Sequence, residues 1–359
     1  MAELKRIVGK TYIGLLVCLL VFNMLILVSD KTDEQQVTYA YIEMLNTAES
    51  VKSDSKLSTE AATIAWQEYF QKYEINGSDR SDKTAAAKQA REKLMQQAKY
   101  IDNYRGIIED KRQTAILYAT AGTYKKNSFE YNNLLKTQYD LSQIIDADVQ
   151  LSNGLWLEKI YKNNYIHLLT LITCVYTVYM FFSERKNGLY HIVHTGQSGR
   201  GVLFVKRSII LLIQAVVTNV ALYTESAVML LNRYDGVKDL NVAAVSDEYF
   251  ILTSGKLSRI QFLGLIILLS ILANVVLSLV LWAILLCFGN VNIGLFFYCC
   301  ICVADVVIYK VISAKSILHI FKYLNVYYLF FPNKAAEYFN WGCFNIAVSL
   351  LTTTITVSV

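Results

Sequence analysis

Long apolar runs recur along this chain, and a polar stretch of 136 residues, Ser29–Asn164, separates the first run from the others. A helix that crosses a bilayer needs roughly 20 predominantly apolar residues, and the runs have about that length. The sequence therefore predicts an all-α polytopic membrane protein with about six transmembrane helices. The predicted spans are Thr11–Val28, Tyr165–Phe182, Val202–Thr224, Ile260–Phe288, Val291–Tyr309 and Cys343–Val359.

Composition fits this class, because 54% of the residues are hydrophobic even though the polar stretch dilutes the spans. The single proline, Pro332, leaves the helices free to run unbroken as far as Phe331. The first apolar run follows Lys5, Arg6 and Lys10, as the core of a signal peptide would. It is long for such a core, and no A-x-A cleavage site follows it, so we expect an uncleaved signal anchor.

The distribution of basic residues predicts the sidedness, because Lys and Arg concentrate on the cytoplasmic side of membrane proteins. The N-terminus is basic, and the loop after the second span has five Lys and Arg residues against Glu184. Both are therefore expected inside, which places the polar stretch outside; its 18 Lys/Arg against 20 Asp/Glu show no positive bias. The chain then divides into residues 1–28 with the first span, an extracytoplasmic helical domain at 29–164, and the remaining spans at 165–359.

The segment 310–342 fits this scheme less well, because it is expected outside yet carries four lysines against Glu337. Its centre, Ile317–Phe331, is amphipathic and aromatic. It either lies in the outer membrane interface, where Tyr and Trp are enriched, or forms a short seventh crossing. His319 and Lys322 favour the interface, since they are costly in hydrocarbon. The last apolar run is short and rich in Thr and Ser, which leaves open a truncated chain or part of a longer polypeptide.

The polar stretch itself shows helical periodicity. Its longest stripe repeats every seven residues, as in a coiled coil, and is interrupted by Gln97 and Lys111. We expect these stripes to pack as a helical bundle, with the alternative that some aromatic positions contact an amphipathic substrate or an outside partner. The stripes are Ala87, Leu94, Ile101, Ile108 and Ala115, then Val37, Tyr41, Leu45 and Ala48, then Trp66, Tyr69, Phe70 and Tyr73.

The loop 183–207 resembles the corresponding loop of the ABC-2 type permease family, the membrane subunits of ATP-driven exporters. In that family an acidic residue, a glycine, a short apolar helix, a Thr/Ser-x-x-Gly-Arg-like turn and a lysine follow one another after the second span. The layout of six spans with an insertion after the first is also similar to that family. The matching residues are Glu184, Gly188, Thr195, Gly199, Arg200 and Lys206.

The resemblance implies that this loop is a coupling helix that sits in a cleft of a separate ATPase subunit. Glu184, Arg185 and Arg200 would make charged contacts with that partner, and Tyr190 would belong to the apolar face that enters its cleft. The alternative is that the basic residues only anchor the loop to anionic lipid headgroups. The implied function is the permease subunit of an ABC exporter in a bacterial cell membrane, working with a second permease copy or homologue and moving a peptide or lipid-like substrate.

Other chemistry is not expected from this sequence. The glycine-rich stretch Gly196–Gly201 is not followed by Gly-Lys-Ser/Thr, so ATP and Mg are expected only in the partner subunit. His191 and His194 lack acidic or cysteine partners nearby, so no metal site is predicted, and no catalytic arrangement is recognisable, so the chain is not expected to be an enzyme. The basic loops are explained by sidedness and do not imply nucleic acid.

Asp305 lies in the middle of a predicted span, where a carboxylate is costly and usually faces a partner or a wet cavity. The candidate partners are Gln214, Asn219, Asn274 and Asn345. Asp305 and the first three of these are a possible translocation path; a structural hydrogen-bonding role for Asp305 is the alternative. Two other functions stay open. A membrane receptor or sensor built on the helical domain would show no dependence on ATP. A secondary transporter would depend on an ion gradient.

Overall fold

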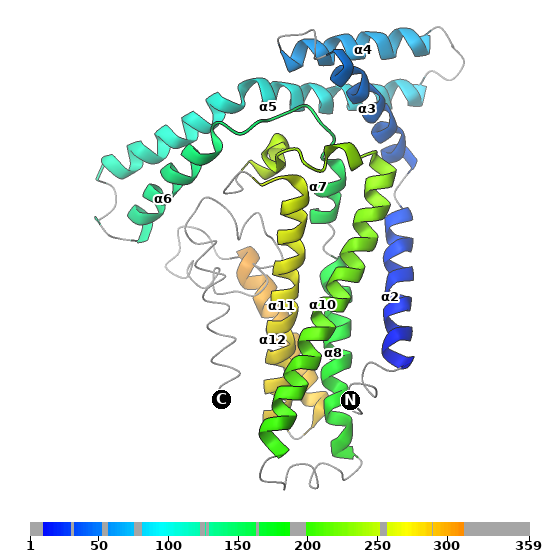
Figure 1. The fold of residues 1–359 in the computed structure, drawn as a ribbon, viewed down its shortest axis with the longest axis vertical. Coiled ribbons are helices and arrows are strands. Elements are labelled where there is room, and N and C mark those ends of the chain that lie inside the picture. Colours follow the sequence, from blue (N-terminus) through cyan, green and yellow to red (C-terminus); the bar gives the residue numbers. More distant parts are fainter. Residues whose placement is uncertain are drawn as a thin grey trace.

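The protein is described by a computed structural model, in which the regular structure of the described residues is helical apart from one isolated antiparallel bridge between Ala243 and Ser258. Helices therefore carry the whole described architecture (Figure 1). The described residues are 10–29, 32–51, 57–74, 81–122, 126, 129–162, 165–186, 199–251, 257–288 and 290–311.

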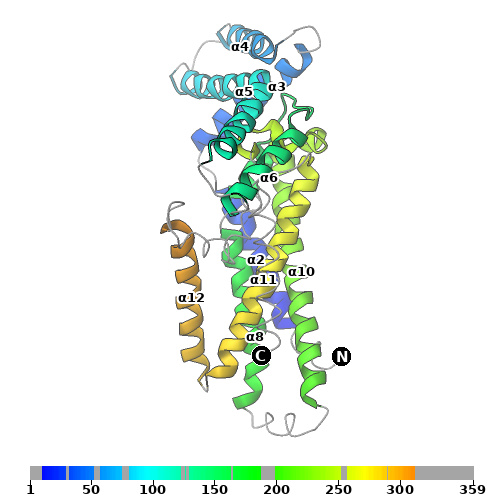
Figure 2. The same ribbon diagram turned by 90° about the vertical axis from the view of Figure 1, so that its left-hand side faces the viewer.

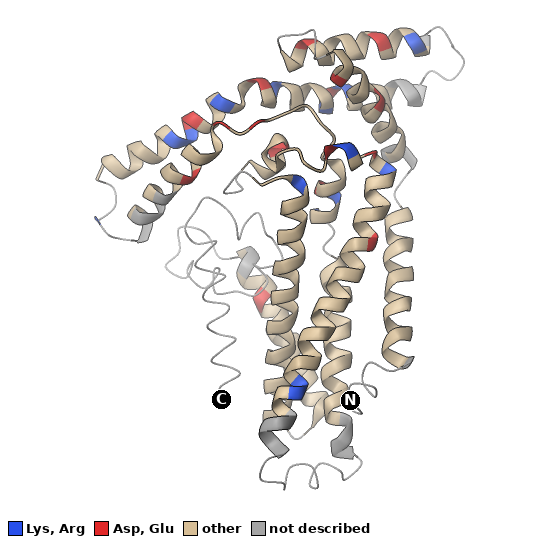
Figure 3. Cartoon of the chain, in the orientation of Figure 1, with Lys and Arg blue, Asp and Glu red and all other residues tan. Residues whose placement is uncertain are grey.

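Within these residues, five helices are long and apolar enough to cross a membrane. They stand side by side, and charged residues are sparse along them and concentrated in the rest of the described chain (Figure 3). This confirms a helical, multi-pass membrane architecture. The predicted sixth span, Cys343–Val359, and the interfacial segment from residue 312 onward lie outside the described residues. The five helices are α2 (Lys10–Val28), α8 (Tyr165–Lys186), α10 (Gly199–Tyr234), α11 (Arg259–Cys287) and α12 (Val291–Val311).

The third span was predicted to end at Thr224, just before the charged residue Glu225. The structure shows that this end is too early, because helix α10 continues to Tyr234. The helix runs ten residues further, because α2 provides partners for its polar side chains. Asn23 donates its amide N–H to Glu225 over 2.7 Å, and Arg233 donates to the carbonyl of Leu27 at the end of α2 over 2.8 Å. A cation at a helix C-terminus satisfies the last carbonyls of that helix.

The polar stretch forms a helical domain around α5 (Ser81–Thr120), against which α3 (Thr32–Val51), α4 (Ser58–Glu74) and α6 (Phe129–Ile144) pack (Figure 1). The seven-residue stripe of α5 lies in its core, with Leu94 and Ile108 fully buried. The aromatic stripe predicted on α4 is confirmed for Trp66 and Tyr69, which are half-buried and pack against the core, but not for Phe70 and Tyr73. Phe70 and Tyr73 are 43% and 44% exposed, because α4 approaches its neighbours through small residues, Ala61, Ala62 and Ala65.

Short elements join this helical domain to the spans. One is α7 (Leu155–Lys162), whose Trp156 and Ile160 are buried against α10 and α11. The others are the 3-10 turns η1 (Val237–Asp239), η2 (Ala244–Ser246) and η3 (Glu248–Phe250), which connect α10 to α11. Gly236 precedes η1 because a Cβ there would lie 2.5 Å from the Trp156 ring. Helix α12 lies at the edge of the described spans, next to α11 (Figure 2), and only 11% of its apolar segment Val291–Ile308 is buried.

Candidate functional site

Two buried polar clusters stand out, one within the spans and one where the helical domain meets them. The first, here called the span cluster, begins between α2 and α10. The Tyr12 hydroxyl lies 2.9 Å from the Thr218 hydroxyl, and the Gln214 amide donates to the Thr173 hydroxyl of α8 over 2.7 Å. All four side chains belong to helices that are otherwise apolar, so these hydrogen bonds fix which faces of α2, α8 and α10 meet.

The span cluster also links α8 to α11. The link on α8 is Cys174, the residue after Thr173. The thiol of Cys174 lies 2.8 Å from the Ser278 hydroxyl, which donates to the Asn274 amide oxygen over 3.3 Å. The cluster therefore crosses four of the five candidate spans, and it brings the predicted path residues Gln214 and Asn274 to the two sides of α8.

Among the predicted path residues, three amide atoms keep unused hydrogen-bonding capacity. Gln214 Oε1, Asn219 Oδ1 and Asn274 Nδ2 are buried, and the described part of the chain offers them no hydrogen-bond partner. Asn219 uses its amide nitrogen on its own helix, donating to the carbonyl of Ala215 over 2.8 Å. Because buried polar atoms are normally satisfied, these two acceptors and one donor mark places where water or a polar solute would be bound favourably.

The fourth predicted path residue, Asp305, belongs to α12, whose contacts with the other spans are mainly with α11. Its side chain is half-buried, whereas Gln214, Asn219 and Asn274 are buried. The hydrogen bonds described above run through α2, α8, α10 and α11. They include Gln214 and Asn274, which do not bond each other but lie on the two sides of α8, whereas Asp305 lies on α12 at the edge of the described spans.

The predicted coupling residues fall at the opposite end of the spans from the helical domain. Glu184 and Arg185 lie in the last turn of α8, and Arg200 lies in the first turn of α10, although their side chains lie outside the described residues. Lys206 is exposed on α10. Gly188, Tyr190 and Thr195 lie in the undescribed segment 187–198. Since α8 and α10 pack along each other, this segment joins the adjacent ends of two spans.

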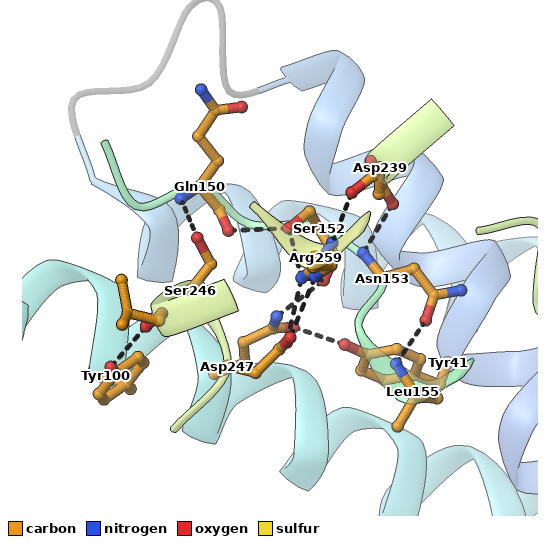
Figure 4. Close-up of polar contacts among 12 residues, drawn as sticks. Tyr41, Tyr100, Gln150, Ser152, Asn153, Leu155, Asp239, Ser246, Asp247 and Arg259 are labelled. Atoms are coloured by element: carbon orange, nitrogen blue, oxygen red, sulfur yellow. Dashed lines mark hydrogen bonds and ion pairs between the residues drawn. The ribbon is translucent and has the colours of Figure 1, made fainter. Parts of the chain in front are cut away.

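The second cluster, here called the junction cluster, is centred on Arg259, the first residue of α11 (Figure 4). The helix begins with a capping box, in which the Ser258 hydroxyl accepts from the Gln261 backbone and the Gln261 side chain accepts from the Ser258 backbone. The Arg259 side chain is fully buried and makes a bidentate pair with Asp247, with both N···O distances at 3.1 Å. Such paired hydrogen bonds fix both distance and orientation.

Arg259 also reaches the chain that descends from the helical domain. Its Nη2 donates to the Ser152 hydroxyl over 2.9 Å. The backbone at Gly154 lies close to Asp247, and only glycine fits there, because a Cβ would lie 2.0 Å from the Asp247 carboxylate. Asn153 adds two ties: its backbone N–H donates to Asp239 over 2.8 Å, and its side chain donates to the carbonyl of Tyr234 at the end of α10.

The helical domain contributes side chains directly to this cluster. Gln97 of α5 donates to the Ser152 carbonyl over 2.8 Å and accepts from the Tyr41 hydroxyl of α3 over 2.5 Å. Tyr100 of α5 donates to the carbonyl of Val245 over 2.6 Å. The junction cluster therefore ties α3 and α5 to the adjacent ends of α10 and α11 (Figure 4).

The electrostatics of the junction cluster depend on this pairing. Burial raises the pKa of the Asp247 carboxyl above its ordinary value, and the Arg259 guanidinium opposes that rise. A carboxylate this deeply placed is stabilised mainly by the cation that it binds. Burial likewise raises the pKa of the Tyr100 hydroxyl, so it is a stable hydrogen-bond donor to Val245 at neutral pH.

The sequence did not single out Arg259, Asp247 or Ser152 as functional residues. The one available signal was Gln97, a polar residue that interrupts an otherwise apolar stripe and that now proves to face the junction. In the part of the chain that the structure describes, no group of three His, Cys, Asp or Glu side chains is placed to hold a metal ion. Comparisons with protein-family models, curated proteins and solved structures find no match for this chain.

Proposed function

We propose that this chain is the permease subunit of an ATP-driven exporter, working in a cell membrane with a separate ATPase and a second permease copy or homologue. The helical domain then lies outside the cell, and ATP and Mg are bound by the partner. The substrate is an amphipathic compound such as a peptide. The resemblance of residues 184–207 to the ABC-2 type permease loop is the starting point of this proposal.

The observation that carries the proposal is the position of that loop. It joins the ends of α8 and α10, two packed spans that both contribute to the span cluster. A partner that pushes on this loop would therefore displace two helices whose contact includes the Gln214–Thr173 hydrogen bond. Movement there would open or close access to the unused amide atoms of Gln214 and Asn219, which supports a translocation role for this part of the spans.

Co-purification from the native host in mild detergent tests the proposal. We expect a protein with Walker A and B motifs to elute with the chain in stoichiometric amount. Glu184→Lys and Arg200→Glu should each release it, whereas Lys88→Glu, an equal charge reversal on the exposed surface of α5, should not. A folded chain that elutes without any ATPase would contradict the exporter and favour the receptor or the secondary transporter.

A further inference from the structure

A cavity of about 780 Å³ adjoins the junction cluster, between α5 and the polar face of α7. Its volume lies within the range of roughly 300–1,000 Å³ that is typical of small-molecule sites. Lys93, Gln96 and Gln97 of α5 line one side, and Glu158, Lys159 and Lys162 of α7 line another, while η3 closes a third side with Glu248 and Tyr249. The polar chemistry of this cavity has no role in the proposed coupling or translocation.

The cavity wall is held in place by the contacts already described. Tyr41 and Gln97 are hydrogen-bonded to each other, and Gln97 is fixed to Ser152. The Asp247 carboxylate, which also lines the cavity, is held by Arg259. Side chains that are fixed in this way bind a ligand without paying the entropy of being ordered.

Exposed groups of both charges surround this fixed wall. Lys93 and Glu248 are exposed and belong to different elements, α5 and η3. Lys162 forms an ion pair with Glu158 and lies over the Tyr249 ring, 4.8 Å from its centre. The cavity therefore offers cations, three carboxylates, amides and aromatic hydroxyls, but Leu155 is its only aliphatic lining residue among those described.

We propose that this cavity binds a short polar peptide, or the end of one, that carries both a positive and a negative charge. Lys93 would pair with a peptide carboxylate, Glu248 with an ammonium group, and Gln96 would hydrogen-bond the peptide backbone. A phospholipid shares the two charges of such a ligand, but its acyl chains need an apolar groove, which a single leucine does not provide. This proposal goes beyond the permease function, because it requires the purified chain to bind the peptide without an ATPase partner.

The test uses the full chain in detergent and a library of tetrapeptides built from Lys, Glu, Tyr and Ser, with acetylated N-termini and amidated C-termini so that only the side chains carry charge. We expect the chain to retain members that contain both Lys and Glu. For the best retained member, Lys93→Glu should weaken binding about tenfold, because an attraction of about 1.4 kcal/mol corresponds to a factor of ten. Glu248→Lys should weaken it in the same way, and the Lys88→Glu control on the same helix should bind like the wild type.

Two results would overturn the proposal. In the first, no tetrapeptide is retained, or Lys93→Glu and Lys88→Glu bind equally well while both variants melt at the wild-type temperature. In the second, Lys93→Glu lowers the amount of co-purifying phospholipid and leaves tetrapeptide binding unchanged, which would make the cavity a lipid site. Neither result bears on the ATPase partner, which is tested separately by co-purification.

Discussion

The junction cluster and the span cluster are both buried and polar, yet they differ in how completely their groups are paired. At the junction, the charges of Arg259 and Asp247 meet in a bidentate pair, and Ser152 and Gln97 extend the network into the helical domain. In the spans, Gln214 and Asn274 each use one end of the amide and leave the other end without a partner in the described structure. A satisfied network fixes one arrangement, whereas unused donors and acceptors permit others.

The largest expected effect comes from breaking the junction pair. Arg259→Met should destabilise the chain by about 3–5 kcal/mol, because it leaves the Asp247 carboxylate buried without its cation. Thermal melting of the purified chain, followed by intrinsic fluorescence, measures this. The double variant Arg259→Met with Asp247→Leu should recover most of the loss; if it melts as low as the single variant, the pair is not what stabilises the junction.

The melting temperature of Arg259→Met should also depend on pH in a defined direction. Burial raises the pKa of Asp247, and removing Arg259 removes the group that opposes the rise. A carboxyl whose folded pKa lies above its unfolded value favours folding at low pH and loses that contribution as the pH rises through the folded pKa. Arg259→Met should therefore regain melting temperature, relative to the wild type, as the pH is lowered from 8 through the folded pKa of Asp247. A difference that stays constant with pH would contradict the assignment.

A smaller effect is expected inside the helical domain, where Asp102 of α5 caps α4. Its two oxygens accept from the backbone N–H groups of Ser58 and Thr59 over 2.8 and 2.9 Å. Asp102→Ala should cost about 1 kcal/mol, as the loss of a helix cap usually does. The measurement is the melting temperature, with Asp110→Ala on the exposed part of the same helix as control.

The pH dependence of this cap has the opposite sign to that of Asp247. Partial burial alone would raise the pKa of Asp102, but the hydrogen bonds from Thr59 and Ser58 together lower it. A lowered folded pKa stabilises the fold above the unfolded pKa and loses that contribution as the pH falls through the folded value. The difference between the wild type and Asp102→Ala should therefore shrink below about pH 4, near the ordinary carboxyl pKa.

The smallest effect on stability is expected in the span cluster. Gln214→Leu removes one hydrogen bond to Thr173 and also removes a buried acceptor without a described partner. Hydrogen bonds between membrane helices average about 0.6 kcal/mol, so the melting temperature should change little. Under the proposed exporter function, transport should nevertheless fall, because this amide would then line the path. Unchanged export together with a large loss of stability would make Gln214 purely structural.

The sequence predicted features that depend on neighbouring residues and missed those that depend on distant ones. Run length identified the five spans, and seven-residue spacing identified the core face of α5. The continuation of α10 past Glu225 could not be predicted, because its partner Asn23 lies 202 residues earlier. The junction was missed for the same reason, since Arg259 meets Ser152 across 107 residues.

The aromatic face of α4 shows a different limit of sequence patterns. Periodicity indicates that residues share a face, but it does not indicate whether that face is covered. In α4 the alanines take the core because small side chains let the helices approach closely, and Phe70 and Tyr73 remain on the outside. The candidate path residues were predicted from polarity alone, which identified Gln214, Asn219 and Asn274 as buried but gave no information on which of their amide atoms would be paired.

The central claim is that the paired junction cluster fixes one arrangement and the partly paired span cluster does not. The most direct test is to measure the distance between the helical domain and the spans. Spin labels at Lys88 of α5 and Leu286 near the far end of α11, both exposed, would be placed in a chain that keeps the buried Cys174 of the span cluster and lacks the other native cysteines. Pulsed electron resonance should give one narrow distance distribution, which Arg259→Met broadens and Gln214→Leu leaves narrow. A distribution that is already broad, or that Arg259→Met does not change, would contradict a junction that fixes the helical domain to the spans.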